Sequence, residues 1–458
     1  MQQTITFDLD LIQRYNKAGP RYTSYPTAVQ FHENFGEVDY RQEAEKTNTF
    51  ANPLSLYLHI PFCDTVCFYC ACNKIATKDR ELTSPYLTHV QKEIALQAEL
   101  FDNSRPVEQL HWGGGTPTFL SHQQMQTLMQ TIGEHFQLVD NGEYSIEIDP
   151  REASVETIEL LHELRFNRMS LGVQDFDPQV QKAVNRIQTE EQTFKILDAA
   201  RNVGFKSVSI DLIYGLPFQS VDSFKHTLEK IVHVMPDRIS VFNYAHLPKI
   251  FKPQRRINEA DLPSPTAKLE ILQYIIHYLT ESGYVYIGMD HFALPEDELA
   301  VAQRYGTLYR NFQGYSTHAG CDLIGLGTTS IGKVGDTYSQ NVKTLAEYYP
   351  AIDAGSIPVF RGITLTEDDK LRREIITQLI CHFQLDIPTI EKDYKIEFTD
   401  YFSEEWQELD TLQEDGLLTY DNQKITVLPA GRLLIRNICM IFDAYLRQSQ
   451  NQRFSKVI

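Results

Sequence analysis

Residues 54–72 read LSLYLHIPFCDTVCFYCAC, an apolar, strand-like run that is followed at once by four cysteines. Three of them, Cys63, Cys67 and Cys70, have a spacing that can wrap thiolates around one face of an iron–sulfur cube and leave the fourth iron without a protein ligand. The alternative is a structural zinc site, which closes its tetrahedron with four ligands, usually as two separated pairs. Because Cys72 follows Cys70 too closely for a good second pair, we favour the open cluster.

Further strand-like runs follow this stretch, with helical segments between them. Six βα units predict a parallel sheet, and short loops between strands of one direction suggest that the sheet curves into a barrel. Each expected strand ends on polar groups, such as Glu147 and Asp211, and in parallel barrels the carboxyl ends of the strands build the site. We therefore expect a shared pocket at that edge. The expected strands are 54–60, 107–112, 144–148, 168–173, 207–213 and 238–242, with a possible edge strand at 284–292.

The composition limits the class of protein. The chain has 458 residues, of which 42% are apolar, so it can bury one large domain and a smaller one. It shows neither a signal peptide nor an apolar run long enough to cross a membrane, which predicts a cytoplasmic protein. Seven cysteines, four of them clustered, suit a reducing compartment. The formal net charge of -19 opposes the binding of nucleic acid.

The sequence pattern changes twice along the chain. Residues 1–50 have little periodicity but many aromatic side chains, and we expect an arm that lies over the active site. Residues 51–345 carry the βα units of the barrel. Residues 346–458 read as helices followed by a hairpin around Asp421, which predicts a small, mostly helical, winged-helix-like domain. Because this domain lacks a basic stripe, a structural or lid role is favoured over nucleic-acid binding.

Several motifs of the chain together resemble one known family. The C-x3-C-x2-C motif, with an aromatic residue before its last cysteine, is similar to the signature of the radical S-adenosylmethionine (SAM) superfamily. With PRYTSYPT at 20–27, YLHIPFC at 57–63, the extra Cys72 and NFQGYSTHAGC at 311–321, the chain resembles the oxygen-independent coproporphyrinogen III oxidase (dehydrogenase) family. The resemblance extends from residue 20 to about residue 335, and it is loose in the C-terminal part.

The resemblance implies an enzyme, an oxidoreductase of haem and porphyrin biosynthesis. Its fold would be of the α/β class, an open, partial (β/α)6 TIM-like barrel with an N-terminal arm and a small helical C-terminal domain. A 4Fe-4S cluster would bind SAM at its open iron, and an electron from a flavodoxin- or ferredoxin-type donor would cleave SAM. The radical so formed would start the oxidative decarboxylation of two propionates of coproporphyrinogen III to vinyl groups, giving protoporphyrinogen IX. A monomer is expected.

The same resemblance implies the site residues, one at a time. Acidic and amide side chains would bind the ammonium group and the ribose of SAM, an arginine its carboxylate, and glycines would let the backbone come close. The implied metal ligands are Cys63, Cys67 and Cys70; the implied catalytic residues are Tyr57, Glu147 and Cys72; and the implied SAM-binding residues are Tyr57, Tyr69, Gly113, Gly114, Gly115, Thr116, Glu147, Gln174, Arg186, Asp211, Ala245 and Ile331.

Other interpretations stay open in the sequence. A radical SAM haem chaperone shares the barrel, but that group typically has no counterpart of Cys72 or of the segment 20–27. A zinc-stabilised regulatory protein and a radical SAM enzyme with another substrate are further alternatives. The role of Cys72 is open, and so is the choice of the cations that hold the substrate carboxylates, for which Arg21 and the basic loop 249–256 are candidates.

Overall fold

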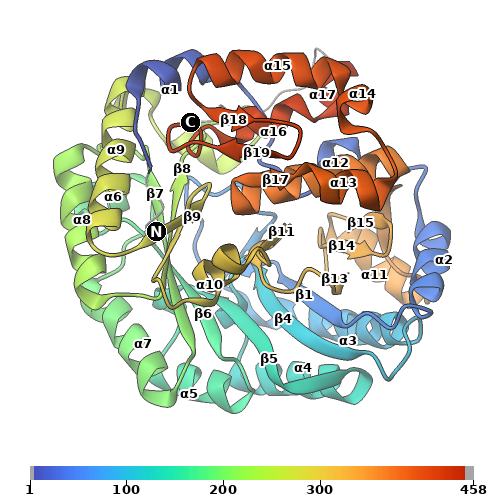
Figure 1. Cartoon of the computed structure of the whole chain (residues 1–458). Coiled ribbons are helices and arrows are strands. Elements are labelled where there is room, and N and C mark those ends of the chain that lie inside the picture. Colours follow the sequence, from blue (N-terminus) through green and yellow to red (C-terminus); the bar gives the residue numbers. More distant parts are fainter. Residues whose placement is uncertain (1–4, 449–458) are drawn as a thin grey trace. The chain divides into compact units, whose positions relative to one another are not determined.

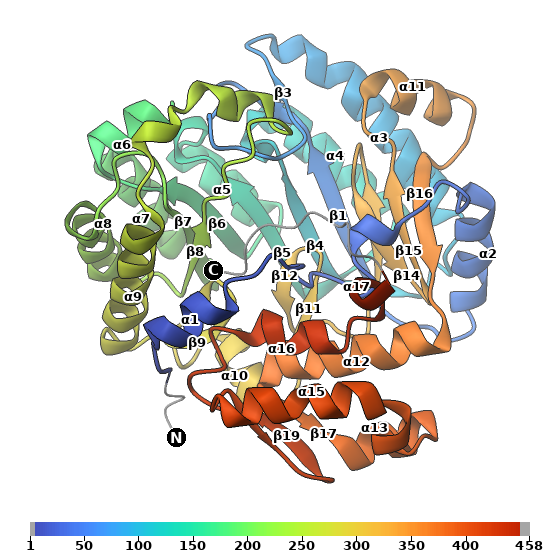
Figure 2. The ribbon, with the colours of Figure 1, turned by 90° about the horizontal axis from the view of Figure 1, so that it is seen from above.

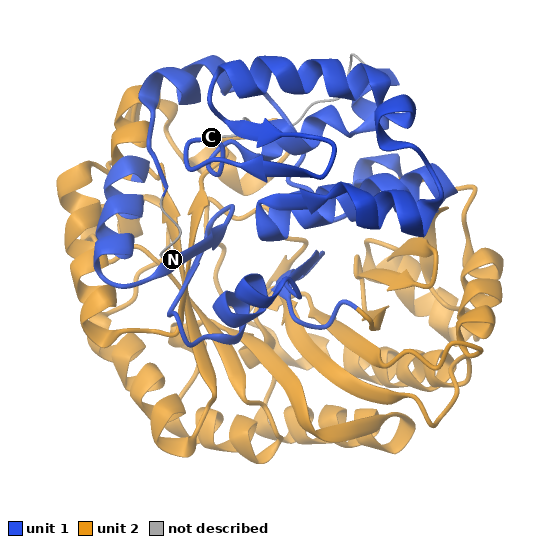
Figure 3. Ribbon diagram, viewed as in Figure 1, with its two compact units in different colours: residues 1–30, 272–319, 365–458 blue, residues 31–271, 320–364 orange. Residues whose placement is uncertain are grey.

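The computed structural model describes residues 5–448, and the chain divides into two compact units (Figure 3). Unit 1 combines Met1–Gln30, Leu272–Ala319 and Leu365–Ile458, and unit 2 combines Phe31–Ile271 with Gly320–Thr364. Each unit is a compact group of residues and brings together segments that are far apart in the sequence. The expected division of the chain at residues 50 and 345 therefore stays a prediction.

Unit 2 is built on a curved sheet whose central strands are parallel (Figure 1). Neighbouring strands follow the chain order β1-β4-β5-β6-β7-β8, as successive βα units require. All six expected strands are confirmed, and with them the α/β class and the partial barrel. Their bounds are β1 Leu54–Ile60, β4 Pro106–Gly114, β5 Gln137–Ile148, β6 Arg168–Gln174, β7 Ser207–Tyr214 and β8 Arg238–Asn243.

Four more strands, which the sequence did not indicate, extend the sheet on the other side of β1. The first of them, β13, pairs with β1 in parallel, from Leu54 opposite Asp322 to Leu58 opposite Leu326. The next three continue the sheet in antiparallel pairs. They are β13 Asp322–Leu326, β14 Ile331–Val334, β15 Thr337–Asn341 and β16 Val359–Thr364.

Helices lie along the outer side of this sheet, as α4, α5, α7 and α8 show in Figure 1. Capping side chains set where several of them begin: Ser121, Ser154 and Ser220 each accept a hydrogen bond from the backbone N–H three residues further on. The helices are α2 Glu37–Thr47, α3 Thr83–Ala98, α4 His122–His135, α5 Val155–Glu163, α6 Pro178–Ala183, α7 Glu190–Val203, α8 Val221–Val234, α11 Leu345–Asp353 and α9 Pro265–Glu281, which starts in unit 2 and ends in unit 1.

The strand periodicity separates the core of unit 2 from its site. On β4, Leu110 and Trp112 are fully buried, and the Trp112 ring meets Phe166 edge-on with 5.0 Å between ring centroids. Because side chains alternate across a strand, His111 lies on the opposite face of the sheet, where Glu147 is also found. Both are only partly buried. The helix-covered face therefore supplies stability, and the other face carries polar groups.

Unit 1 joins the N-terminal segment to the C-terminal helices (Figure 2). Tyr22, which is buried, donates its hydroxyl hydrogen to Asp443 at 2.9 Å, and the Arg436 guanidinium donates to the carbonyl of Pro20 at 2.8 Å. The segment around Pro20 and Tyr22 is thus fixed by residues of the C-terminal region. The elements are α1 Leu9–Tyr15, β9 Val285–Gly288, β10 His291–Ala293, α10 Glu298–Tyr305, β11 Tyr309–Asn311, β12 Gly314–Ser316, α12 Glu367–His382, β17 Gln384–Asp386, α13 Ile387–Tyr394, α14 Phe398–Tyr401, α15 Ser403–Glu414, β18 Leu418–Tyr420, β19 Lys424–Val427, α16 Ile435–Ile441 and α17 Ala444–Gln448.

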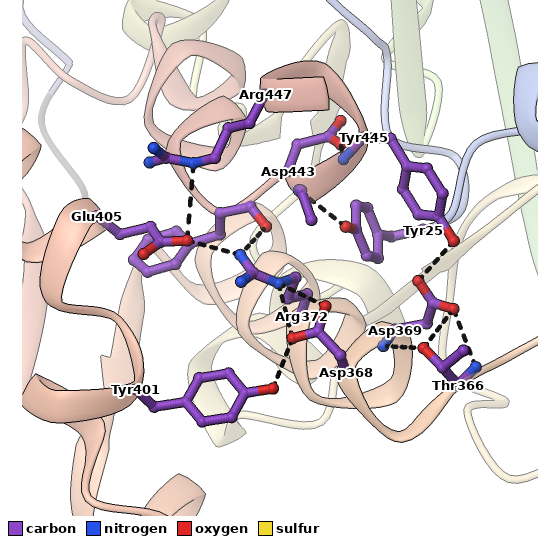
Figure 4. Close-up of polar contacts among 12 residues, drawn as sticks. Tyr25, Thr366, Asp368, Asp369, Arg372, Tyr401, Glu405, Asp443, Tyr445 and Arg447 are labelled. Carbon is purple, nitrogen blue, oxygen red and sulfur yellow. Dashed lines mark hydrogen bonds and ion pairs between the residues drawn. The ribbon is translucent and has the colours of Figure 1, made fainter. Parts of the chain in front are cut away.

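Arg372 on α12 is the centre of an ion-pair network in unit 1 (Figure 4). Its guanidinium pairs with Glu405 of α15 at 2.8 Å and with Asp368, one helical turn earlier, at 2.9 Å. Tyr445 of α17 donates to Asp369 at 2.9 Å. Because a buried charge is costly unless it is paired, each of these helices is held in the position that keeps the pairs intact.

Two sequence expectations for unit 1 change in detail. The expected strand at 284–292 is a hairpin, β9 and β10, because the chain turns back at Met289, whose φ is 54°. The expected hairpin near Asp421 is confirmed as β18 and β19, and β17 adds a third strand to it. Among residues 5–448, no helix is long and apolar enough to span a membrane.

Candidate active site

The four clustered cysteines lie in the loop that leaves β1. A short parallel pairing closes this loop, with β2 (Phe62–Cys63) beside β3 (Ile75–Ala76). Cys63 and Cys67 are buried, Cys70 is half-buried and Cys72 is exposed, and all four thiols are free. The folded loop therefore gathers the three expected ligands near the carboxyl end of the first strand and leaves Cys72 towards solvent.

Two arginines face one of these sulfurs. The Arg186 and Arg151 guanidiniums lie 3.5 and 3.7 Å from the Cys67 Sγ atom. Both also pair with Asp149 at the end of β5, at 3.0 and 2.6 Å. One carboxylate thus fixes two guanidinium groups beside the sulfur of Cys67, one of the three expected ligands.

The glycine turn at the end of β4 packs directly on the end of β1 and the cysteine loop. Gly114 has a φ of 115°, which favours glycine, and a Cβ atom there would come 2.7 Å from the His59 ring. A Cβ atom on Gly115 would come 2.7 Å from the Phe62 carbonyl oxygen. Thr116, the next residue, donates its hydroxyl to Cys63 Sγ at 3.5 Å. The expected glycines and threonine therefore lie beside the cysteines.

A row of side chains crosses β1, β4 and β5 on the same face. Tyr57 stacks on His111, with 5.8 Å between ring centroids and 14° between planes. His111 Nδ1 lies 2.6 Å from the Ser145 hydroxyl, and its Nε2 lies 3.6 Å from the Glu147 carboxylate, which also accepts from the Gly114 N–H at 3.0 Å. Burial raises the pKa of Glu147, but the hydrogen bond and charge of His111 outweigh it and leave the pKa below its usual value. Glu147 is therefore an anion at neutral pH.

A second histidine links this row to the cysteine loop. The Tyr57 hydroxyl lies 3.2 Å from His59 Nδ1, and His59 Nε2 lies 3.1 Å from the Asn73 carbonyl oxygen. Burial lowers the pKa of His59, so the ring is neutral at pH 7 and donates through the nitrogen that faces the carbonyl. The imidazole then accepts from the tyrosine, which fixes the direction of the Tyr57 hydroxyl.

The next two strands carry the predicted amide and carboxyl groups. Gln174 has a positive φ of 70°, and the pairing of β6 with β7 shifts register between Gly172 and Gln174. Asp211 on β7 accepts from the Ser170 hydroxyl at 2.5 Å, and burial raises its pKa to about 6. Gln174 is the last residue of β6, whereas Asp211 lies within β7, three residues before its end.

Asp175 follows Gln174 but does not take part in the site. Its carboxylate accepts from the Thr227 hydroxyl at 2.6 Å and from the Gln219 amide at 2.5 Å, on the helix side of the sheet. The expectation that all polar strand ends share one pocket is therefore wrong at this residue, whose partners come from α8 and the loop before it.

The remaining expected residues lie on the loops around these strands. Gln254 donates its amide to the carbonyls of Tyr69, at 2.9 Å, and Ala245, at 3.2 Å, and so joins the cysteine loop to the segment after β8. Ile331 begins β14 and packs against Gly325 of β13, which pairs with Tyr57. These contacts place expected residues beside strands or loops of the site, without assigning their roles.

The sequence did not single out His111, Arg151 or Gln254 as functional. Arg151 could have been recognised from the sequence, because it follows Asp149 by two positions just after a strand. His111 is at an inward position of β4, and its partners Tyr57 and Ser145 are known only once the strands are in register. Gln254 reaches Tyr69 across 185 residues of sequence, so no local pattern indicates the contact.

Two family models match the chain. The model described as "Radical SAM superfamily" covers residues 57–231, which include the cysteine loop and the strands β4 to β7. The model described as "HemN C-terminal domain" covers residues 365–434, within unit 1. The first match includes five of the six parallel strands of the barrel at least in part.

Similar proteins extend over the whole chain. The oxygen-independent coproporphyrinogen III oxidase of Pseudomonas aeruginosa is 54% identical to it, and the alignment covers 100% of both chains. The enzyme of the same name from Escherichia coli K12 is 53% identical, and the alignment covers 100% of this chain and 99% of the relative. The solved structure titled "Coproporphyrinogen III oxidase (HemN) from Escherichia coli is a Radical SAM enzyme" superposes with a TM-score of 0.93 at 51% identity, covering 97% of this chain and 100% of that one. The chain therefore belongs to the oxygen-independent coproporphyrinogen III oxidase family of the radical SAM superfamily.

Proposed function

We propose that this chain is an oxidoreductase that converts two propionate side chains of coproporphyrinogen III to vinyl groups, giving protoporphyrinogen IX. The observation that carries the proposal is the cysteine loop at the carboxyl end of β1, held in a chain that aligns end to end with enzymes named for this activity. Each propionate loses CO2, one hydrogen atom and one electron, so the chemistry is an oxidation.

The residues of the loop suit a 4Fe-4S cluster and SAM. Three free cysteines stand beside guanidinium and hydroxyl donors, which fits a cluster bound by thiolates. The glycine turn leaves the space beside Glu147 free of a Cβ atom, since one on Gly113 would lie 3.1 Å from its carboxylate. When bound, the two cofactors supply radical chemistry that can remove hydrogen from an unactivated carbon.

The chain's own residues bind and orient these groups in the proposed site. Cys63, Cys67 and Cys70 ligate the cluster. Glu147, whose pKa is lowered by His111, is an anion and accepts hydrogen bonds from the ammonium group of SAM. Tyr57 stacks on His111 in the same row of side chains. The remaining proposed SAM contacts are Arg186 for the carboxylate, Gln174 and Asp211 for the ribose, Tyr69, Ala245 and Ile331 for the adenine, and Gly113, Gly114, Gly115 and Thr116 for the methionine end.

Several finer points belong to the same proposal. Cys72, exposed at the end of the cysteine loop, acts in catalysis without ligating the cluster. A hydrogen bond between the two thiols lowers the pKa of Cys70 and raises that of Cys72, so Cys72 keeps its proton more readily. A flavodoxin- or ferredoxin-type protein supplies the electron, and the chain works as a cytoplasmic monomer.

Anaerobic reconstitution tests the function directly. The protein is loaded with iron and sulfide, mixed with reductant, SAM and coproporphyrinogen III, and the oxidised porphyrin products are identified by mass. We expect the divinyl product, and none from Cys67→Ala. A chain that binds the tetrapyrrole and cleaves SAM without forming vinyl groups would instead match a radical SAM haem chaperone, an alternative that the named relatives do not favour.

A further inference from the structure

Arg310 is a buried arginine without an acidic partner among residues 5–448. It is 8% exposed, and its Nε and Nη1 atoms have no hydrogen-bond partner. Its guanidinium carbon lies 4.6 Å from the centre of the Tyr315 ring. A cation–π contact does not satisfy the N–H groups, and a buried charge with free donors is costly unless an anion completes it. The side chain is therefore built to receive one.

The hairpin of β11 and β12 holds this arginine in place. Arg310 and Tyr315 are opposite each other in the pairing, which lays the cation on the ring. The Tyr315 hydroxyl donates to the Ile380 carbonyl at 3.2 Å and so fixes the ring. Gln313, in the turn of the same hairpin, has a buried amide nitrogen that also lacks a partner. One short hairpin thus offers two sets of unused donors.

Two further arginines of unit 1 act on the same region. Arg436 is 4% exposed and donates to the backbone carbonyls of Gly19 and Pro20, while Arg21, the next residue, pairs with Asp290 at 3.3 Å. Burial and the positive charges of Arg21 and Arg310 lower the pKa of Arg436 to about 10. Arg436 is therefore repelled by two further guanidiniums, one of which already pairs with Asp290, in a chain whose formal net charge is -19.

We propose that Arg21, Arg310 and Arg436 form a binding site for a carboxylate of the tetrapyrrole substrate. The proposal rests on the proposed function, which gives the ligand its propionates. Guanidinium N–H groups match a carboxylate in pairs, and Arg310 supplies Nε and Nη1 donors that no described residue of unit 1 accepts from. Arg21, whose side chain is 39% exposed, exchanges Asp290 for the incoming carboxylate. Arg21 was a candidate from the sequence, and Arg310 and Arg436 are assigned by the structure.

Binding of coproporphyrin III, the oxidised and unreactive form of the substrate, tests the site without turnover. Fluorescence titration of the full-length chain is expected to show at least about tenfold weaker binding for Arg310→Gln, the loss of a charge-assisted hydrogen bond. Coproporphyrin tetramethyl ester, which has the same ring without the charges, is expected to bind both proteins equally. Arg14→Gln is the matched control, because Arg14 is an exposed arginine of unit 1 that already pairs with Asp415.

Any of the following results would contradict the proposed carboxylate site. Unchanged coproporphyrin affinity in Arg310→Gln overturns it, as does an equal loss with the tetramethyl ester, which would report shape. If Arg310→Gln weakens the binding of S-adenosylhomocysteine and leaves coproporphyrin binding unchanged, the arginine binds the carboxylate of SAM, and the proposal is also wrong. If Arg310→Gln fails to fold, Asp290→Asn decides: freeing Arg21 is expected to strengthen coproporphyrin binding several-fold, and unchanged or weaker binding contradicts the proposal. Vinyl product from the wild-type chain keeps the proposed function intact in every one of these cases.

Discussion

Gly115 leaves no room for a side chain. A Cβ atom there would lie 2.7 Å from the Phe62 carbonyl oxygen and 3.0 Å from that of Ile60, and backbone cannot move aside as a flexible side chain can. We expect Gly115→Ala to displace the cysteine loop and to lower the iron and sulfide bound per chain by at least about half after reconstitution. Chemical analysis of the purified protein measures both.

Gly133→Ala is the matched control for this change. Gly133 lies in α4 with nothing within 4 Å of the added atom, and alanine favours a helix by about 1 kcal/mol over glycine. Its iron content is expected to equal that of the wild type. Full iron loading of Gly115→Ala would show that the loop tolerates the shift and that the close approach is unimportant.

Residues in local patterns were the easiest part of the site to predict. The spacing of Cys63, Cys67 and Cys70 is a short-range feature, and so is the glycine turn. The pairing of Arg186 with Asp149 spans 37 residues and depends on two strands lying next to each other, so neither residue type reveals it alone. Arg310 could not be predicted from the sequence. It stands out only because its Nε and Nη1 atoms have no hydrogen-bond partner among the described residues, and this is visible only in the structure.

At the scale of elements, Asp175 ties the end of β6 to α8. Its buried carboxylate accepts from Thr227 and Gln219, so Asp175→Ala leaves those donors unpaired and opens a small void. We expect a loss on the order of 3 kcal/mol in stability, because a buried network is broken. The midpoint of thermal unfolding is expected to fall by several degrees.

Asp222→Ala provides the comparison for that measurement. Asp222 is an exposed acid in the first turn of α8, and its loss removes only a weak interaction with the helix dipole, on the order of 0.5 kcal/mol. A thermal midpoint of Asp175→Ala no lower than that of Asp222→Ala would mean that α8 does not depend on the buried carboxylate.

The same scale explains which elements the sequence indicated. The strands β1 and β4 to β8 are apolar runs between turns, and their bounds were predicted to within two residues, except that β5 begins seven residues before its expected start. In contrast, β15 reads TYSQN and has no apolar periodicity; it is a strand because β14 and β16 pair with its backbone on both sides. Such strands depend on partners that a local pattern does not contain.

At the scale of the whole molecule, Glu93 makes stability depend on pH. This residue of α3 is fully buried in unit 2 and accepts hydrogen bonds from Tyr348, Asn341 and the Gly327 N–H. Burial nevertheless raises its pKa from 4.5 to about 7. Because the folded state holds the proton more tightly, this stabilisation is complete below pH 4.5 and is lost as the pH rises through 7.

Glu93→Gln is expected to remove that pH dependence. Between pH 5 and pH 8, the urea midpoint of the wild type is expected to fall relative to the variant by an amount corresponding to a few kcal/mol. Glu99→Gln, which changes an exposed glutamate near the end of the same helix, is expected to keep the wild-type slope. Parallel slopes for the wild type and Glu93→Gln would show that Glu93 does not hold its proton in the folded chain.

The contact between Pro20 and Arg436 has a consequence for synthesis of the chain. Pro20 leaves the ribosome 416 residues before Arg436, which binds its carbonyl, whereas the strands from β1 to β8 are made as one continuous run. A nascent chain can therefore assemble its parallel strands before Arg436, which binds the segment around Pro20, has been made. A premature stop between residues 364 and 436 leaves that segment without Arg436 and Asp443, so these residues must be made before the segment around Pro20 can take its folded position.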